Sequence, residues 1–293
     1  MSFTIKELET LSGIKAHTIR IWEQRYQFIK PSRTSTNIRT YSNEELKTLL
    51  SVALLNKYGY KISQINKMPE DERNRQILNI PSEEVKTEWL VNRLIGCMID
   101  LRTAEFEHLL DQHIAEKGIS ATLKEIVFFF LNRIGILWQT GKIHPAHEHI
   151  VTNIVRQKIV SAIEGLKITT QDEPQFLLLL PEDEHHELGL LFVYYLLKQK
   201  QLPVLYLGAS VPLKDADFIT NLKAPRYIYI HLTSLRSTTA LKKFISVISS
   251  KYPKVQILLS GSAASVIKEK PDNLTIFNSL PEVSAFIETV QFV

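Results

Sequence analysis

Hydrophobic and polar positions change their spacing twice along the 293-residue chain. The first part combines short helical patterns with a polar, basic stretch. The middle part holds four longer patterns in which apolar residues recur every three or four positions, as on one face of a helix. In the last part, short apolar runs of strand length alternate with amphipathic helical patterns. This order predicts three domains, with the bounds 1–72, 83–170 and 173–293.

A linker is expected between the first two domains. Pro69 and Pro81 bracket a polar stretch, and prolines commonly interrupt helices. We therefore interpret residues 73–82 as a connection between independent units. Beyond it, short connections between the helical patterns favour an antiparallel four-helix bundle. The expected helices of this bundle span residues 83–101, 104–116, 121–139 and 145–166.

The last part of the chain predicts a parallel sheet, because apolar strands that alternate with helices are joined by crossovers. The fold class is therefore multidomain α and α/β, ending in a five-stranded, doubly wound, Rossmann-like sheet. The expected strands span residues 176–180, 204–207, 227–231, 256–259 and 274–277. The expected helices span residues 187–200, 213–222, 238–250 and 263–269, and a last one begins at Pro281. Ligands of such sheets bind beyond the carboxyl ends of the strands, which makes the loops after Leu180, Leu232 and Leu259 candidate binding loops.

The first domain has the spacing of a helix-turn-helix. Residues 5–11 and 15–26 form helical patterns around a tight turn at Gly13, so the second helix can enter a major groove. Residues 32–41 are rich in Ser, Thr and Asn, which indicates a wing. Ser42 and the two glutamates after Asn43 predict the start of another helix.

The net charge of +4 lies in this first domain. Residues 1–43 hold seven Lys or Arg against three Glu, and the opposite charges balance in the rest of the chain. A small basic module points to nucleic acid, and the alternative is an ordinary solvated surface. The candidates for base edges are His17, Thr18 and Arg20, with Arg25 and Tyr26 further along the helix, and the candidates for phosphates are Arg33, Arg39 and Tyr41.

Three short patterns in this domain favour DNA. The segment TIRIWEQRY, followed by P-x-R and N-x-R-x-Y, resembles the DNA-binding domain of the MerR family of transcription regulators. The resemblance covers residues 1 to about 72 and implies a winged helix-turn-helix. It also implies double-stranded operator DNA with an inverted repeat and a homo-oligomer, because one such module makes too few contacts for specific affinity.

The loop after the first expected strand contains Glu184, His186 and Gly189 in the pattern E-x-H-x-x-G. A His in an acidic loop is commonly a surface residue. The spacing, however, resembles the cobalamin-binding motif D-x-H-x-x-G, whose His coordinates cobalt while the acidic residue orients the ring. A carboxylate can fix the tautomer of an imidazole and raise its basicity. The resemblance assigns the lower axial cobalt ligand to His186 and the partner role to Glu184.

Two further loops carry altered parts of the same signature. Thr233 and Ser234 begin the triplet Thr-Ser-Leu where the family has S-x-L, and the Thr233 hydroxyl is implied to meet the nucleotide tail. Gly261 and Ser262 stand where a Gly-Gly pair is usual, and the Cβ of Ser262 reduces the space for the tail. By itself, Gly261 also fits an ordinary turn between a strand and a helix.

The helical bundle carries a Trp, nine residues and then a Glu-His pair. This arrangement of Trp138, Glu148 and His149 resembles that of light-sensing cobalamin repressors of carotenoid synthesis, whose bundle covers the upper face of adenosylcobalamin. The resemblance implies that Trp138 covers the adenosyl group, that Glu148 accepts from ribose hydroxyls and that His149 lies near the upper face. The alternative is a core Trp138 and a surface helix that starts at Glu148-His149.

One departure concerns the upper face. Gln139 follows the Trp, and a Gln cannot serve as the second His ligand that the photoreceptors use after illumination. His144, His147 or His149, or a water, are the alternatives. The same His cluster also permits a zinc site.

Together these expectations describe a non-enzymatic transcription repressor. Adenosylcobalamin is the expected cofactor, with methylcobalamin as the less favoured form, and light is expected to break the cobalt–carbon bond and release the DNA. The expected assembly is a dimer or tetramer. No apolar run of about 18 residues and no leader pattern is visible, which favours a cytoplasmic protein that makes no use of a membrane. The alternatives are a light-independent regulator that senses cobalamin or a protein partner, and a cobalamin carrier of a methyltransferase or mutase.

Overall fold

The computed structural model describes residues 2–139, 143–167, 174–234, 238–264, 267 and 271–291, without the side chains of residues 136–139, 238 and 240. The chain divides into two compact units, Met1–Ile154 and Val155–Val293. The division falls inside a long helix rather than in the connection near residues 170–173 that the sequence patterns indicate.

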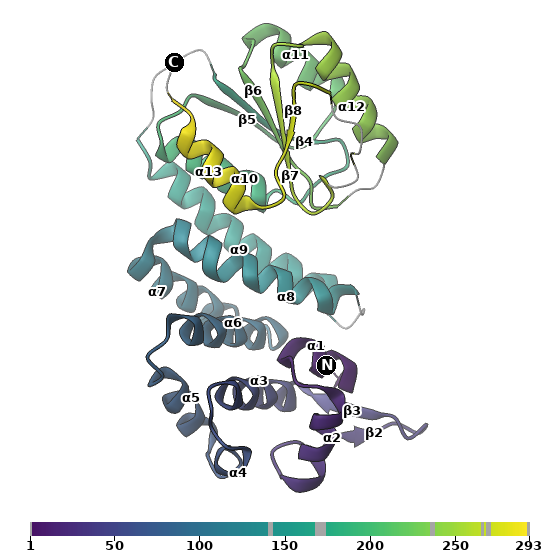
Figure 1. Cartoon of the computed structure of the whole chain (residues 1–293), viewed down its shortest axis with the longest axis vertical. Coiled ribbons are helices and arrows are strands. Elements are labelled where there is room, and N and C mark those ends of the chain that lie inside the picture. The colour runs from purple at the N-terminus through teal and green to yellow at the C-terminus, as the bar shows by residue number, and fades with distance from the viewer. Residues whose placement is uncertain are drawn as a thin grey trace. The chain divides into compact units, whose positions relative to one another are not determined.

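The first unit begins with a helix-turn-helix (Figure 1). Helices α1 (Ile5–Ser12) and α2 (Ala16–Arg25) flank a turn at Gly13, whose φ of 72° lies in the left-handed region that favours glycine. Helix α3 (Asn43–Lys57) starts at an N-cap, Ser42, which accepts a hydrogen bond from the backbone of Glu45. A three-stranded antiparallel sheet completes the module, in the order β1 (Ser2–Phe3), β3 (Arg39–Ser42), β2 (Ser32–Arg33). The winged fold that the sequence predicts is therefore confirmed.

The predicted linker is wrong as a structural element. After the short helix α4 (Ile62–Ile65), residues Glu70–Leu78 form helix α5. The side chain of Ile77 is fully buried, and Arg73 is 8 % exposed and donates to the carbonyl of Met68 at 2.8 Å. This polar stretch is thus a packed helix with a narrow buried face.

The four helical patterns of the middle part appear as α6 (Glu83–Ile99), α7 (Thr103–Ala121), α8 (Phe128–Gln139) and α9 (Pro145–Glu164). Helix α7 runs beyond its predicted end and kinks at Gly118, where φ is 81°. A π-helical turn, η1 (Thr122–Val127), joins it to α8. Apolar side chains fill the inner faces, for instance the edge-to-face pair Phe106 and Phe130, whose ring centres lie 5.5 Å apart.

The second unit holds the predicted five-stranded sheet, and every pairing in it is parallel. The strand order is β5 (Val204–Val211), β4 (Phe176–Pro181), β6 (Tyr227–His231), β7 (Gln256–Ser260), β8 (Leu274–Ile276). Its helices are α10 (Leu188–Gln199), α11 (Leu213–Lys223), α12 (Thr238–Lys251) and α13 (Leu280–Thr289). The expected helix 263–269 falls largely on residues outside the described part.

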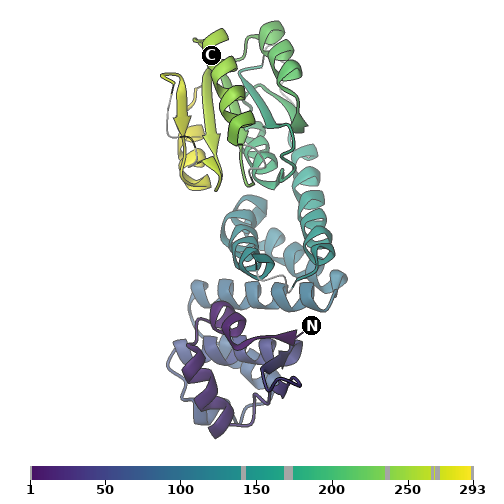
Figure 2. The ribbon, with the colours of Figure 1, turned by 90° about the vertical axis from the view of Figure 1, so that its right-hand side faces the viewer.

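Helices cover both faces of this sheet (Figures 1 and 2). Alternate residues of the central strands, such as Leu177 and Ile228, pack with Leu241 and Ile248 of α12 in one buried cluster. Helices α10 and α13 lie on the opposite face (Figure 1). Because the strands are parallel, the loops after β4, β6 and β7 meet at one edge, as the doubly wound fold requires.

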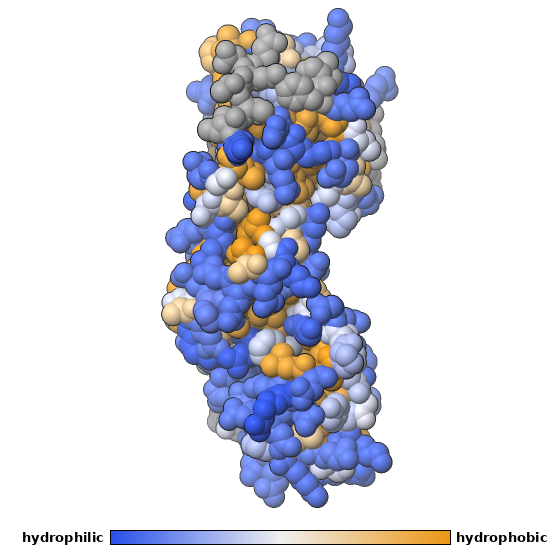
Figure 3. All heavy atoms as spheres, turned by 90° about the vertical axis from the view of Figure 1, so that its left-hand side faces the viewer, coloured by the Kyte–Doolittle hydropathy of each residue, from blue (hydrophilic) through white to orange (hydrophobic). Residues whose placement is uncertain are grey.

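On the face shown in Figure 3, hydrophilic side chains predominate and apolar patches are small. Among the described helices, none combines the length and the apolar character needed to cross a bilayer.

Candidate functional site

Helix α2 presents the predicted DNA-contacting residues on its outer face. Ile19 and Trp22 are buried and anchor the helix to the module. His17, Arg20 and Arg25 are exposed on it, and Thr18 and Tyr26 are partly exposed. A helix that is packed on one side and basic on the other can approach a duplex.

The three residues predicted to contact phosphate differ in their exposure on the wing. Arg33 is exposed and donates to Asn37 at 2.7 Å across the wing turn. Arg39 is partly buried, and its Nε lies 3.0 Å from both carboxylate oxygens of Glu23 on α2. The prediction that Tyr41 contacts phosphate is wrong, because its side chain is fully buried and its hydroxyl donates to Glu23 at 3.4 Å. Burial and the neighbouring charge of Glu23 raise the pKa of Tyr41 to about 12.

The loop between β4 and α10 brings Glu184 and His186 together as predicted. Glu184 is 4 % exposed, and its Oε1 lies 2.7 Å from Nδ1 of His186. The same oxygen accepts the backbone N–H groups of His185 at 2.9 Å and His186 at 3.0 Å. The carboxylate therefore orients both the loop and the imidazole.

The second oxygen of Glu184 reaches the loop after β6. Its Oε2 accepts the backbone N–H groups of Thr233 at 3.1 Å and Ser234 at 2.8 Å. Burial raises the pKa of Glu184, but the hydrogen bonds from His186 and Ser234 outweigh it and lower that pKa to about 2. A carboxylate that stays ionised thus connects two of the three candidate loops.

The third loop approaches by backbone contact. Gly261 has a φ of 99°, and a Cβ at this position would lie 2.1 Å from the carbonyl oxygen of Leu232. Ser262 is exposed and donates through its hydroxyl to the carbonyl of Thr233 at 3.0 Å. The three loops after β4, β6 and β7 therefore form one site at the carboxyl edge of the sheet. Leu235 of the S-x-L-like triplet lies outside the described residues.

Two family models match the chain. The model of MerR helix-turn-helix family regulatory proteins matches residues 3–71, and the model of the B12 binding domain matches residues 90–161. Residues 3–71 are therefore similar to MerR-type DNA-binding modules and residues 90–161 to a B12 binding domain, and both matches lie in one chain.

Named proteins with similar sequences agree with this assignment. The chain is 28% identical to the HTH-type transcriptional repressor CarA of Myxococcus xanthus over 214 residues, which are 72% of this chain and 70% of that relative. Over 272 residues, 90% of each protein, it is 24% identical to the HTH-type transcriptional repressor CarH of the same organism. A monomethylamine corrinoid protein of Methanosarcina barkeri has a similar fold, with a TM-score of 0.56 and 12% identity over 69% of this chain and 98% of that one.

The bundle residues that are predicted to contact the cofactor lie on α8 and α9, within the segment that the B12 binding domain matches. The backbone of Trp138 and Gln139 belongs to α8, and their side chains lie outside the described part. Glu148 is partly buried and His149 is exposed, with 3.4 Å between Oε2 and Nδ1. Within the described residues, no group of three or more His, Cys, Asp or Glu has the arrangement of a metal site, so the zinc alternative finds no support there.

Two residues at the carboxyl edge of the sheet, which we call the cofactor edge, were not predicted from the sequence. Glu187 follows His186 directly, accepts from Nε of Arg156 on α9, and accepts from the Tyr206 hydroxyl at 3.0 Å. His231 is 8 % exposed at the end of β6. The acidic run around Glu187 gave a weak signal, whereas a single His at the end of an apolar strand gave none.

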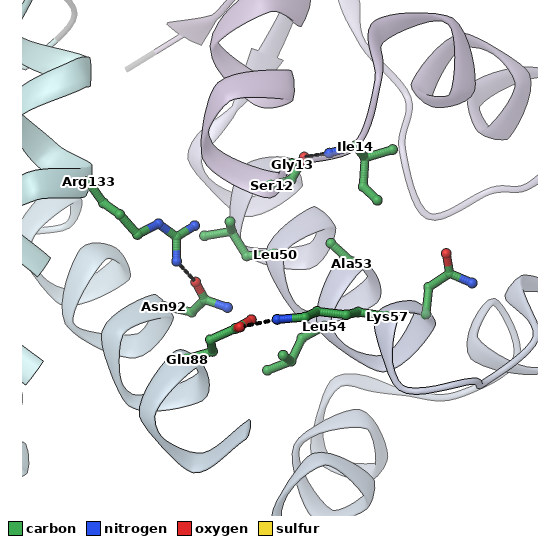
Figure 4. A pocket seen from close by; sticks show the side chains of 11 residues that line it. Ser12, Gly13, Ile14, Leu50, Ala53, Leu54, Lys57, Glu88, Asn92 and Arg133 are labelled. Atoms are coloured by element: carbon green, nitrogen blue, oxygen red, sulfur yellow. Dashed lines mark hydrogen bonds and ion pairs between the residues drawn. The ribbon is translucent and has the colours of Figure 1, made fainter. Parts of the chain in front are cut away.

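A separate cavity of about 240 Å³ lies in the first unit, between the MerR-type module and the bundle (Figure 4). Polar groups at its wall bind one another: Lys57 forms an ion pair with Glu88, and Arg133 donates to the amide oxygen of Asn92 at 2.7 Å. Arg133 also donates to the carbonyl of Leu11 at the end of α1. The bond from Arg133 to Leu11 therefore joins α8 to the DNA-binding module beside this cavity, and we call it the junction.

Proposed function

We propose that this chain is a transcription repressor that binds operator DNA through its winged helix-turn-helix and uses adenosylcobalamin as a light-sensitive effector. The observation that carries the proposal is the Glu184–His186 pair at the ligand-binding edge of a parallel sheet. The same chain also holds a MerR-type module, which connects a ligand site with DNA binding. The relatives named above are transcriptional repressors, which favours repression and a regulatory rather than an enzymatic role.

The chemistry of the donor set fits a cobalt ligand. Oε1 of Glu184 accepts the Nδ1–H of His186. This bond keeps the proton of the ring on Nδ1, so the lone pair lies on Nε2. An ionised carboxylate in this position also raises the basicity of the imidazole. The residues proposed to hold the rest of the lower face and the nucleotide tail are Gly189, Thr233, Ser234, Gly261 and Ser262.

The proposed upper-face residues belong to the bundle. Trp138 covers the adenosyl group, Glu148 accepts from its ribose, and His149 lies close by. When bound, adenosylcobalamin supplies a cobalt–carbon bond that visible light breaks. Trp138 and Glu148 would hold the adenosyl group in the dark and would lose this contact after the bond breaks, so the bundle would change its arrangement. We propose that the dark form is a dimer or tetramer, located in the cytoplasm, on an inverted repeat, and that light releases it.

The second candidate is a regulator that senses cobalamin without light. Gln139 favours it, because this side chain cannot replace the departing adenosyl group as a His would. Under this alternative, methylcobalamin serves as well as adenosylcobalamin.

A visible absorption spectrum tests the cofactor. The full chain is incubated with adenosylcobalamin in the dark, desalted, and measured before and after green illumination. Retained colour and a light-dependent change are expected. His186→Ala should weaken retention by about tenfold or more, whereas His185→Ala, at the exposed neighbour in the same loop, should not. A colourless wild-type protein overturns the cobalamin proposal, and retained colour without a light response selects the second candidate.

Selection from a random DNA library tests the operator. The dark, cofactor-loaded chain should enrich duplexes that contain an inverted repeat, and illumination before selection should abolish enrichment. Arg20→Ala should weaken binding to the selected duplex. Enrichment without any repeat, or no enrichment by a properly folded chain, contradicts the proposed DNA recognition.

A further inference from the structure

Ile21 is an exposed aliphatic side chain on helix α2. Within residues 2–72, all of which the structure describes, the exposed large hydrophobic side chains are Ile21 at 42 % and Ile38 at 57 %. One lies on α2 and the other in the wing, which are the two elements predicted to contact DNA. Single aliphatic residues are common on protein surfaces, so the place of Ile21 on this helix is what distinguishes it.

The orientation of α2 in the module is fixed on the side opposite to Ile21. Ile19 and Trp22 are 0 % and 6 % exposed and pack into the core. The carboxylate of Glu23 holds Nε of Arg39 on β3, with 3.0 Å to both oxygens. At 100° per residue, Ile19, Trp22 and Glu23 occupy one side of the helix. Ile21 therefore lies on the outer side, which the module itself does not cover.

The neighbours of Ile21 on this outer face are polar. His17 lies one turn before it, Gln24 and Arg25 lie one turn after it, and all three are exposed. A hydrophobic protein partner would need a contiguous apolar patch, which these residues interrupt. A major groove instead offers hydrogen-bonding base edges and one apolar group, the 5-methyl of thymine. Residues 1–43, with seven Lys or Arg against three Glu, supply the charge that a duplex requires.

We propose that Ile21 is a specificity-determining residue that recognises a thymine in each operator half-site through its 5-methyl group. The inference rests on the proposed function, because it requires α2 in the major groove. Contact between the aliphatic side chain and the methyl removes apolar surface of both partners from water. Cytosine has no methyl at this position, so the contact favours thymine over cytosine. The thymine is expected beside the base pairs that His17 and Arg20 contact.

The test compares thymine with deoxyuridine, which lacks only the 5-methyl group. The duplex selected by the dark, cofactor-loaded chain is synthesised with deoxyuridine at one thymine position of the half-site at a time. Fluorescence anisotropy at a fixed salt concentration gives the affinity for each duplex. For the wild-type chain, deoxyuridine at one position should weaken binding about fourfold per half-site, the effect of one buried methyl group. Ile21→Ala should bind the thymine and deoxyuridine duplexes of that position equally.

Two further variants control the comparison. Leu78→Ala is the matched control, because Leu78 is 44 % exposed and ends α5, outside the helix-turn-helix and the wing. It should keep the full preference for thymine. Ile21→Val retains a branched aliphatic side chain and should keep part of the preference. Because Ile21 is exposed, its truncation is expected to leave the module folded.

The outcomes separate this inference from the proposed function. A thymine preference that persists in Ile21→Ala overturns the role of Ile21, and so does a wild-type chain that distinguishes thymine from deoxyuridine at no position. Equal weakening of all duplexes by Ile21→Ala, together with loss of self-association, also overturns it and assigns Ile21 to a protein contact. Failure of the wild-type chain to enrich any duplex instead overturns the proposed DNA recognition itself.

Discussion

Replacement of Gly261 by Ala should destabilise the second unit strongly. Gly261 follows β7 with a φ of 99°, and an added Cβ would lie 2.1, 2.7 and 2.8 Å from the O, C and N atoms of Leu232. These atoms belong to a backbone that two hydrogen bonds hold in place. Leu232 donates to Ser260 at 2.8 Å, and Ala263 donates to Leu232 at 3.1 Å. Neither side can yield without moving the end of β6 or β7.

The magnitude follows from these contacts. A left-handed backbone costs roughly 1–2 kcal/mol for a residue with a Cβ. Weakening the two backbone hydrogen bonds adds about 1 kcal/mol each. We therefore expect Gly261→Ala to lower the free energy of unfolding by about 3–4 kcal/mol. A loss of this size is a large fraction of the total stability of a typical domain, about 5–15 kcal/mol.

Urea unfolding of the full chain measures this loss. Trp22, Trp89 and Trp138 all belong to the first unit, so tryptophan fluorescence reports that unit alone. Far-UV circular dichroism reports both units. Gly261→Ala should shift the dichroism transition of the second unit to lower urea and leave the fluorescence transition in place.

Gly165→Ala is the matched control, because the added Cβ would meet only ordinary contacts at 3.6 Å. It should change the free energy of unfolding by less than about 1 kcal/mol. If Gly261→Ala behaves like this control, the close approach of the two loops does not exist in solution and the reasoning is refuted.

Three further predictions concern single side chains. Burial lowers the pKa of His231 from 6.5 to about 4, so as the pH decreases the unfolded chain binds a proton at this ring before the folded chain does. The free energy of unfolding should therefore fall between about pH 6.5 and 4. In His231→Phe this part of the pH dependence, measured by urea unfolding, should be lost, and an unchanged profile contradicts the prediction. Arg133→Met removes the bonds to Leu11 and Asn92 and should lower the free energy of unfolding of the first unit, measured by tryptophan fluorescence, by about 1–3 kcal/mol. If the variant unfolds at the urea midpoint of the wild type, the junction between α8 and the DNA-binding module does not stabilise this unit. Ser42→Ala removes the N-cap of α3 and should cost about 1 kcal/mol in the same assay; a cost near zero would falsify the capping role.

The sequence predicted elements well where one face of each element is strongly apolar. The run of apolar residues in β4, Phe176–Pro181, is typical of a strand buried on both faces, and the parallel sheet confirms it. Helix α5, Glu70–Leu78, was missed because Ile77 is its one fully buried apolar side chain and its remaining surface is polar. Periodicity cannot detect a helix with so narrow a buried face.

The candidate site was predictable only where its residues are close in sequence. Glu184 and His186 are two positions apart, so their pairing could be expected from spacing. The prediction that Tyr41 contacts phosphate was wrong because residues two apart in a strand share a face. Tyr41 lies on the same face as Arg39, and both side chains bond Glu23. His231 was missed because Ser260, the partner of its Nδ1, lies 29 residues away, and only the folded sheet brings the two strands together.

The carboxylate of Glu184 also has a consequence for hydrogen exchange. Loop amides ordinarily exchange quickly with solvent, because local opening exposes them at little cost. Thr233 and Ser234 lie in a loop, yet their N–H groups are bound by a carboxylate that is 4 % exposed and belongs to a loop about 50 residues earlier. These two amides can exchange only when both loops separate. Their exchange should therefore be slow and should follow that of the strands β4 and β6, which makes them a direct readout of whether the cofactor edge is assembled.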